Sequence, residues 1–407
     1  PQWRGPDGNG VTTQTELPIA WSEHFGVEWK CELPEWGTST PAVWDDAIFL
    51  TSHVDEKDLV LLKINKKTGE IEWTRKVGTG SALRGRPFVN RGRQKFHEDH
   101  NLASPSPVTD GKLVVAHFGN GDLAAYDFRG KQLWHRNLQD DHGEYTVWWG
   151  HANSPVFYKD LVISVCMQDS CRDIRQECAP SYVVAHNKQT GNQVWKTMRM
   201  TDAIRMSGDS YTTPIFREAD GRTEMIVIGG QMLDAYDPTN GRQLWYLPGL
   251  VGTEVIRTPV AAHGMIYATQ GMRRAVLAVK PGGNGKRTQD DIIWSCGQGL
   301  YNSPSPVVAG ELLFMVNNYG ILRCFDAHTG RLKWKERIKG EYRASPLVAD
   351  GRVYFLNMEG LTTVVSASPR FDRLTENQLD DETIASPAVS DGKIFIRGRK
   401  SLYCLRK

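Results

Sequence analysis

A short motif, in which a glycine precedes a tryptophan by four residues, constrains the fold of this chain more than any other feature. Each glycine ends a polar turn, and an alternating apolar stretch precedes each turn. A strand, a tight turn with glycine at a positive φ, and a second strand together form a β-hairpin. The motif occurs at Gly69–Trp73, Gly130–Trp134, Gly191–Trp195, Gly241–Trp245 and Gly330–Trp334.

A second repeated unit lies between these hairpins and begins with a Ser/Thr–Pro pair. Small apolar residues and then an aromatic or β-branched run follow each pair, often with Asp-Gly or His-Gly between them. This pattern predicts a second hairpin whose proline begins a strand, where a missing N–H costs little. The pairs are Thr40-Pro41, Ser106-Pro107, Ser154-Pro155, Thr213-Pro214, Thr258-Pro259, Ser305-Pro306, Ser345-Pro346 and Ser386-Pro387.

Two hairpins per repeat predict a four-stranded antiparallel blade. Eight Ser/Thr–Pro pairs therefore predict an all-β fold, an eight-bladed β-propeller that forms one domain over residues 1–407. The seventh blade lacks the Gly-x-x-x-Trp motif. The predicted blades span residues 39–77, 103–138, 153–199, 211–247, 257–296, 303–338, 343–379 and 384–407.

The eighth blade ends one strand early, at Leu402–Leu405. A strand with the missing tryptophan lies near the other end of the chain, at 27–33, after an N-terminal extension of residues 1–26. Pairing the two ends would remove the largest exposed sheet edge. We therefore expect the N-terminal strand to complete the last blade. One tryptophan per blade at a fixed place indicates packing between blades, because an indole fills the gap between twisted sheets.

Seven cysteines are too few for a disulfide scaffold. Ring closure would place Cys31 and Cys404 on adjacent strands, so they form either a disulfide or two buried free thiols. Another disulfide is expected within the 167–181 insertion if the protein is exported, between two of Cys166, Cys171 and Cys178. Zinc is disfavoured there because a fourth cysteine is missing nearby.

The balance of 49 basic and 47 acidic residues argues against a nucleic-acid partner. No apolar run is long enough for a transmembrane helix. The chain begins with Pro1 and carries no signal peptide, so we expect a trimmed or mature form of a periplasmic or otherwise exported protein.

The hairpins resemble the pyrroloquinoline-quinone (PQQ)-type repeat, Ala-x-Asp-x-x-Thr-Gly-x-x-x-Trp, over essentially the whole chain. The opening Trp3-Arg4-Gly5-Pro6, with Gly8-Asn9-Gly10 and later Trp21-Ser22 and Trp29-Lys30, is similar to PQQ-like propellers of planctomycete-type bacteria. The resemblance extends to the propeller lipoprotein of the outer-membrane assembly machine and to quinoprotein alcohol dehydrogenases. It implies the fold, whereas function depends on the site that each protein adds.

Long loops enter the Ser/Thr–Pro strands on one face of the predicted disc, chiefly at 78–103, 138–153 and 199–212. Their basic and aromatic residues are expected to line a central cavity that suits an anionic or polyhydroxylated ligand. The alternative is that the arginines pair with loop acids and only stiffen the loops. The candidates are Arg84, Arg86, His100, Asn101, His142, Trp148, Trp149, His151, Arg205, Tyr211, Arg257, Tyr301, Asn302, Tyr342 and Arg343.

Histidines and aspartates in two neighbouring loops are of metal-ligand type, but none forms a compact motif such as His-Glu-x-x-His. We therefore predict no metal site. The weak candidates are His97, Asp99, His100 and His151, with His142 and Asp141 in the neighbouring loop.

The chain departs from the quinoprotein dehydrogenase pattern, because it has no adjacent cysteines and no Cys-x-x-Cys-His haem site. Only Glu254, Asn302, Asn317 and Asn318 suggest a calcium site, and loosely. We predict no catalytic residue and no cofactor, and an exported scaffold that binds a partner protein or a polymer. One alternative is an oxidoreductase that uses PQQ with Ca²⁺. A second is a carbohydrate binder that stacks sugars on Tyr145, Trp148 and Trp149.

Overall fold

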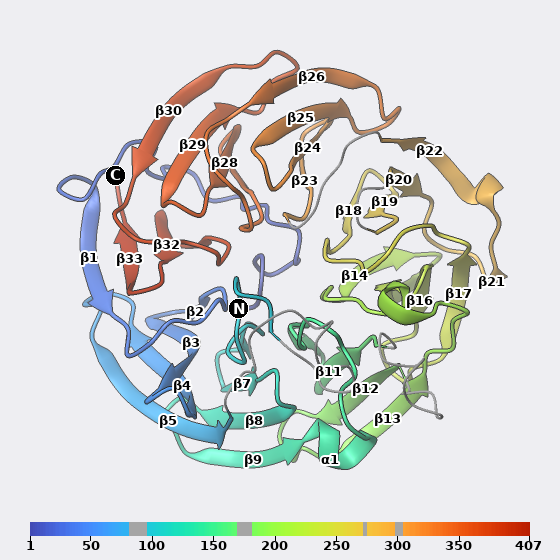
Figure 1. Ribbon diagram of the computed structural model, residues 1–407, viewed down its shortest axis with the longest axis horizontal. Coiled ribbons are helices and arrows are strands. Elements are labelled where there is room, and N and C mark those ends of the chain that lie inside the picture. The colour runs from blue at the N-terminus through green and yellow to red at the C-terminus, as the bar shows by residue number, and fades with distance from the viewer. Residues whose placement is uncertain (81–95, 169–180, 272–274, 298–303) are drawn as a thin grey trace.

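Eight antiparallel sheets stand around a central channel in the computed structural model (Figure 1), which confirms the predicted all-β, eight-bladed propeller. The structure describes residues 1–80, 96–168, 181–271, 275–297 and 304–407. Short helices lie at α1 (Leu138–His142), η2 (Arg205–Ser207) and η3 (Gln289–Asp291). Within those described ranges, no helix is long and apolar enough to cross a membrane.

Each of the first four blades is built from consecutive strands, from the channel outward. Blade 1 contains β2 (Ala42–Trp44), β3 (Ala47–Val54), β4 (Asp58–Asn65) and β5 (Ile71–Thr79). Blade 2 contains β6 (Val108–Thr109), β7 (Leu113–His117), β8 (Asp122–Asp127) and β9 (Gln132–Asn137). Blade 3 contains β10 (Val156–Tyr158), β11 (Leu161–Cys166), β12 (Tyr182–Asn187) and β13 (Gln193–Met198). Blade 4 contains β14 (Ile215–Ala219), β15 (Arg222–Gly229), β16 (Met232–Tyr236) and β17 (Gln243–Pro248).

The next three blades repeat this order. Blade 5 contains β18 (Val260–Ala262), β19 (Met265–Thr269), β20 (Val276–Val279) and β22 (Ile292–Cys296). Blade 6 contains β23 (Val307–Ala309), β24 (Leu312–Val316), β25 (Ile321–Asp326) and β26 (Leu332–Arg337). Blade 7 contains β27 (Leu347–Ala349), β28 (Arg352–Leu356), β29 (Leu361–Ser366) and β30 (Arg373–Gln378). A short strand between β20 and β22, β21 (Gly285–Lys286), pairs in parallel with β17 and gives blade 4 an additional outer strand.

The N-terminal strand completes the last blade, as the sequence predicted. Blade 8 contains β31 (Ala388–Ser390), β32 (Lys393–Arg397) and β33 (Ser401–Leu405), and β1 (Val27–Glu32) pairs with β33. Of the two alternatives for Cys31 and Cys404, the structure has the second, because both are buried free thiols. The register explains this: Cys31 lies opposite Leu402, and Cys404 lies opposite Trp29. The two thiols are therefore diagonal neighbours, and burial raises the pKa of Cys31 to about 11 and that of Cys404 to about 12.

The tryptophans join neighbouring blades, as expected. The indole N–H of Trp134 donates to the Lys188 carbonyl of the next blade at 2.9 Å, and Trp73 does the same to Phe128 at 3.1 Å. A glycine of the next hairpin lies under the Trp134 ring, since a Cβ on Gly191 would come within 2.6 Å of the indole, and Gly69 and Gly330 lie in the same way against Trp29 and Trp294. Trp29, Trp294 and Trp334 make the corresponding bonds to Lys66, Ala327 and Ser368.

The Ser/Thr–Pro pairs form a hydrogen-bonded ring around the channel. From Thr40 to Ser345, the backbone N–H of each Ser or Thr donates to the hydroxyl of the equivalent residue in the next blade, for example from Thr258 to Ser305 at 3.0 Å. Equivalent bonds run through Thr40, Ser106, Ser154, Thr213, Thr258, Ser305, Ser345 and Ser386. The serine or threonine therefore links blades, in addition to the role of the proline at the start of a strand.

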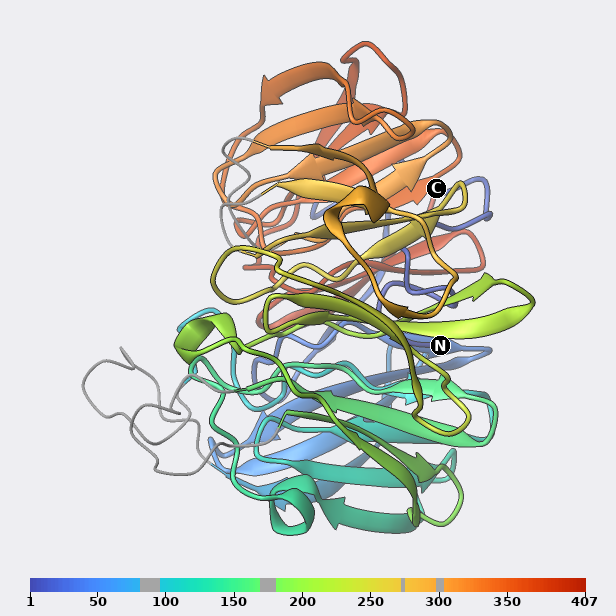
Figure 2. The same cartoon turned by 90° about the vertical axis from the view of Figure 1, so that its right-hand side faces the viewer.

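The N-terminal segment crosses the end of the channel where the short turns lie. The Pro1 carbonyl accepts from Thr109 in blade 2 at 2.8 Å, and Val11 forms a parallel bridge with Val348 in blade 7. Arg4 is buried and donates to the Pro306 carbonyl in blade 6 at 2.6 Å. Figure 2 shows the N-terminus on the right of the disc, and the long loops that the structure describes extend to the left. The channel is thus covered at one end.

Candidate functional site

A cavity of about 1080 Å³ lies at the long-loop end of the channel. The Ser/Thr ring and the loops that enter the inner strands surround it, and Trp3 of the N-terminal segment contributes to its lining. Polar and aromatic side chains dominate the described part of its wall. They include His97, Asp99, His100, Trp149, Tyr211, Glu254 and Arg343.

An ion-paired group connects the two sides of this cavity. The Asp99 Oδ2 atom lies 2.7 Å from Arg343 Nε and 3.3 Å from His97 Nδ1. Burial by itself raises the pKa of Asp99. The hydrogen bonds and charges of His97 and Arg343 outweigh this effect and lower the pKa to about 2. The carboxylate therefore stays ionised and holds Arg343 in place. This is the loop-stiffening arrangement that the sequence left open as an alternative for the arginines.

Trp149 is held from two directions. His100 Nε2 lies 2.7 Å from the Trp149 carbonyl, while the other His100 nitrogen contacts the Ser104 hydroxyl at 3.0 Å. The Trp149 N–H donates to the Tyr211 hydroxyl at 3.3 Å, and the His97 ring meets the indole edge-on at a centroid distance of 5.1 Å. Burial raises the pKa of Tyr211 well above its ordinary value, so its hydroxyl stays protonated. The result is a fixed aromatic wall.

Several predicted ligand-binding residues support the loops and do not line the cavity. Asn101 is buried and donates from its side chain to the Trp36 carbonyl at 2.9 Å. Trp148 is buried, and its backbone N–H donates to the Asp209 carboxylate at 3.0 Å. His151 is buried between the rings of Tyr145 and His117, each at a centroid distance of 4.7 Å.

Tyr342, Arg257 and His142 also lie away from the described cavity wall. Tyr342 is buried between blades 6 and 7, where its hydroxyl donates to the Lys339 carbonyl at 2.8 Å. Arg257 is buried, and burial together with the charge of Arg323 lowers its pKa to about 10. His142 lies in α1, near the outer edge of blade 2. Four other predicted residues, Arg84, Arg86, Tyr301 and Asn302, lie outside the described residues, as does the Arg205 side chain.

The weak metal candidates do not gather around one point. His97 is close to Asp99, but both ring nitrogens of His100 are engaged by Trp149 and Ser104, and His151 lies against Tyr145. The predicted pairing within the 167–181 insertion is excluded for Cys166, which is a free, buried thiol. Cys171 and Cys178 lie outside the described residues.

Sequence reasoning missed part of the cavity wall. In the sequence, Trp3 stands out only as part of the family-like opening, and Glu254 only as a loose calcium candidate. Met206, Gly252 and Thr253 carry no motif at all. The repeated Ser/Thr–Pro pairs were the available signal, since their regular spacing places one hydroxyl per blade at the channel.

A family model described as outer membrane protein assembly factor BamB matches residues 11–177 and 276–371, which is more than half of the chain. The chain belongs to this family. No curated protein sequence matches it.

Solved structures with the same fold include both assembly factors and dehydrogenases. BamB from Moraxella catarrhalis superposes with a TM-score of 0.64 at 12% identity, covering 93% of this chain and 99% of that one. Quinohemoprotein alcohol dehydrogenase from Comamonas testosteroni gives 0.67 at 12% identity, covering 95% and 78%. A europium-containing methanol dehydrogenase gives 0.66 at 12% identity, covering 98% and 90%. At these identities the likeness shows the fold alone.

The described cavity wall offers little unpaired positive charge to an anionic ligand. Arg343 is the arginine on the described wall, and Asp99 already neutralises it. Glu254 adds a second carboxylate, and no cysteine is present among the described lining residues. These residues favour a ligand without strong negative charge.

Proposed function

We propose that this chain is an exported, non-catalytic propeller that binds a partner protein through its long-loop face. The supporting observation is a set of large apolar side chains that are exposed on two neighbouring loops of this face: Met200 is 80% exposed, Ile204 59% and Val251 49%. Single exposed apolar residues are ordinary, but a cluster on one face is typical of an interaction site. Methionine in particular adapts its shape to a partner.

The loops that carry these residues are joined to each other and to the cavity. Ser210 forms a bridge with Val255, and the Tyr211 N–H donates to the Val255 carbonyl at 2.9 Å. Residues of the same two loops, Met206 and Thr253, line the cavity. The two loops that carry the exposed apolar side chains therefore also form part of the cavity wall, and aromatic anchors surrounded by apolar contacts are typical of binding hot spots.

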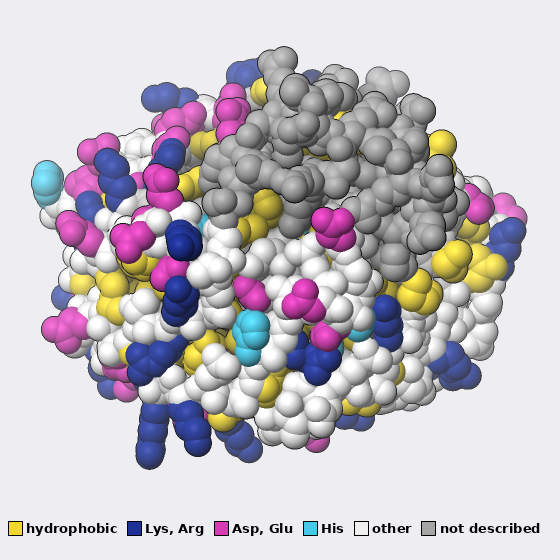
Figure 3. All heavy atoms as spheres, turned by 60° about the horizontal axis from the view of Figure 1, so that its bottom comes forward, with side chains coloured by type: hydrophobic (Ala, Val, Ile, Leu, Met, Phe, Trp, Pro, Cys, Tyr) yellow, Lys and Arg dark blue, Asp and Glu magenta, His cyan; other side chains and the backbone are white. Residues whose placement is uncertain are grey.

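The charge distribution fits a protein partner better than a nucleic acid. Figure 3 shows Lys and Arg side chains interspersed with Asp and Glu over the described surface of one face. The net charge of +2 is small for a chain of this length. The family description names an assembly factor of the outer membrane, which supports both a protein partner and export.

The test replaces Met200, Ile204 and Val251 together with aspartate. Because all three side chains are exposed, the variant is expected to fold like the wild type. Immobilised protein is incubated with an envelope extract, and retained proteins are quantified. A specific partner should be reduced on the order of tenfold or more, since each lost apolar anchor weakens binding.

The matched control is the double variant Leu332→Asp and Leu374→Asp. These residues are also exposed and apolar, but they lie on the outer strands of blades 6 and 7. The control should retain the partner as the wild type does. Equal retention of every protein by all three forms would contradict the proposal.

Calorimetric titration with PQQ and Ca²⁺ distinguishes the dehydrogenase alternative from the scaffold proposal. No heat is expected from the wild type. Tight binding that is lost in the Arg343→Ala and Glu254→Gln variants would replace the scaffold proposal with the cofactor-dependent one.

For the carbohydrate alternative, Trp149 is the one residue of its three aromatics that lines the cavity. Retention on a polysaccharide column that is abolished by Trp149→Ala would favour it.

A further inference from the structure

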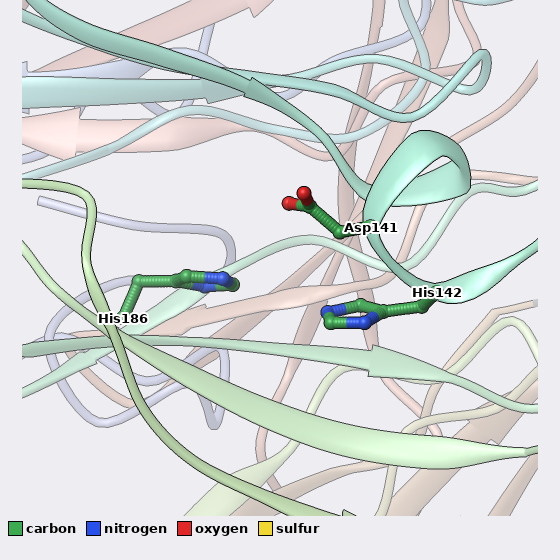
Figure 4. A group of neighbouring side chains, drawn as sticks. All are labelled: Asp141, His142 and His186. Carbon is green, nitrogen blue, oxygen red and sulfur yellow. The ribbon is translucent and has the colours of Figure 1, made fainter.

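A cluster of metal-ligand side chains lies outside the central cavity, where blade 2 meets blade 3. Asp141 and His142 are at the end of α1, directly after blade 2, and His186 lies on β12 of blade 3. One ligand atom from each residue lies within 4.8 Å of the other two. Figure 4 shows the two imidazoles facing each other, with the Asp141 carboxylate above the space between them.

The histidines of this cluster lack the partners that buried polar groups normally have. His186 is fully buried, and neither of its ring nitrogens has a hydrogen-bond partner among the described residues. The same holds for Nε2 of His142. Leaving a buried polar group without a partner costs free energy, so such groups indicate a missing ligand or ion.

The surroundings favour neutral imidazoles, which is the form that binds metals. Burial lowers the pKa of His186 to about 4 and also lowers that of His142, and nearby Arg136 and Lys196 act in the same direction. Both rings therefore offer a lone pair at neutral pH. The Tyr182 ring packs edge-on against His142 at a centroid distance of 4.9 Å and fixes its position.

The ligand set also indicates the class of metal. Arg136 donates to Asp141 Oδ2 at 2.8 Å, which leaves Oδ1 available. Arg136 and Lys196 bring positive charge close to the site, which opposes cations held mainly by charge, such as Ca²⁺ and Mg²⁺. Two imidazoles and a carboxylate instead suit Zn²⁺ or a similar ion, with water in the fourth position.

We propose that Asp141, His142 and His186 bind a divalent transition metal ion of the zinc class, which ties the end of blade 2 to the middle of blade 3. This site is separate from the long-loop face and does not depend on the function proposed for that face.

A second cluster on the molecule provides a matched control. The ligand atoms of His263, Glu311 and His328 also lie within 4.8 Å of one another, but all three residues are exposed. Their ligand atoms are also already engaged, because His328 Nε2 contacts Glu311 at 2.5 Å and His263 Nε2 contacts the Gly310 carbonyl at 2.8 Å. The control variant is therefore His263→Ala with His328→Ala.

The experiment uses the metal-free protein with all 407 residues, which is titrated with Zn²⁺ by calorimetry and with Co²⁺ by visible absorption. The wild type and the control variant should bind one ion with equal affinity. His186→Ala should weaken binding by more than the roughly 100-fold that loss of an outer-shell partner can cost. The Co²⁺ spectrum should be that of a tetrahedral site and should disappear with the same variant.

Two further variants keep the test informative if His186→Ala does not fold. Asp141→Asn keeps the size of a partly exposed side chain and should weaken Zn²⁺ binding, whereas Arg136→Gln removes the competing cation and should leave binding intact or strengthen it. The proposal is overturned if the wild type binds no Zn²⁺, if binding survives both Asp141→Asn and His142→Ala, or if the control variant loses it.

Discussion

At the residue scale, the repeated glycine of the hairpins meets two separate physical demands. Gly191 has a φ of +71°, and a Cβ there would overlap the Trp134 ring of the preceding blade. Only glycine satisfies both the turn and the close approach of the indole. The glycine of this motif is therefore required both by the turn within its own blade and by a contact with the preceding blade.

Gly191→Ala is predicted to destabilise the protein more than Gly351→Ala. Gly351 has nearly the same φ, +70°, but a Cβ there meets nothing within 4 Å. The Gly351 variant should lose about 1 kcal/mol from backbone strain alone, and the Gly191 variant about 2–4 kcal/mol because the indole must also move. Thermal denaturation of the two variants checks this, and equal losses would show that the indole contact is unimportant.

Asp99 is predicted to give the protein an acid-sensitive contribution to stability. Its pKa falls from 3.8 to about 2 on folding, so the contribution is complete above pH 4 and disappears as the pH falls from about 4 to about 2. Asp99→Asn should cost about 2 kcal/mol at pH 7 and progressively less below pH 4. Urea unfolding of both proteins at several pH values measures the difference, and a constant difference across pH would contradict the assignment.

At the element scale, β1 decides whether the ring has an open edge. It pairs with β33, and the preceding residues also hold the floor of the channel through Trp3 and Arg4. An exposed strand edge is a template for pairing with another chain. The strand and the floor can be separated by truncation, because the floor lies entirely before residue 27.

Deletion of residues 1–32 is predicted to cause association that deletion of residues 1–26 does not. The longer deletion leaves the hydrogen-bonding groups of β33 unpaired, while the shorter one removes the floor and keeps β1. Light scattering and the midpoint of thermal unfolding check this. Similar behaviour of the two truncated proteins would mean that the floor, and not the strand, stabilises the ring.

At the scale of the whole molecule, the ring of Ser and Thr hydroxyls connects the blades around the channel. Each bond joins residues about 40 to 66 positions apart, so the ring forms only when the blades are in place. Ser305→Ala should destabilise by about 1–3 kcal/mol because it leaves the buried Thr258 N–H without an acceptor. Ser305→Thr keeps the hydroxyl and serves as the control, and thermal unfolding measures both.

The strands, the number of blades and the closure of the ring could be read from the chain because they depend on local chemistry. The turn glycines, the alternating apolar residues and the Ser/Thr–Pro pairs each act over a few neighbouring positions. The tryptophan spacing added the one contact between blades that repeats regularly enough to be visible.

The candidate site was only partly predictable. His100, Trp149, Tyr211 and Arg343 do line or support the cavity, but His142, Arg257 and Tyr342 come from loops of similar composition and end elsewhere. Loop composition does not tell which way a side chain points, because that depends on partners in other blades.

The sequence by itself determined the propeller, since its repeats encode the same short-range sterics again and again. Only the tertiary structure decided which side chains meet. Asp99 pairs with Arg343 across 244 residues, and His142 meets His186 from the neighbouring blade. Such contacts join segments that are distant in the sequence. They depend on the sum of many packing interactions, so the contacts themselves leave no local pattern in the chain.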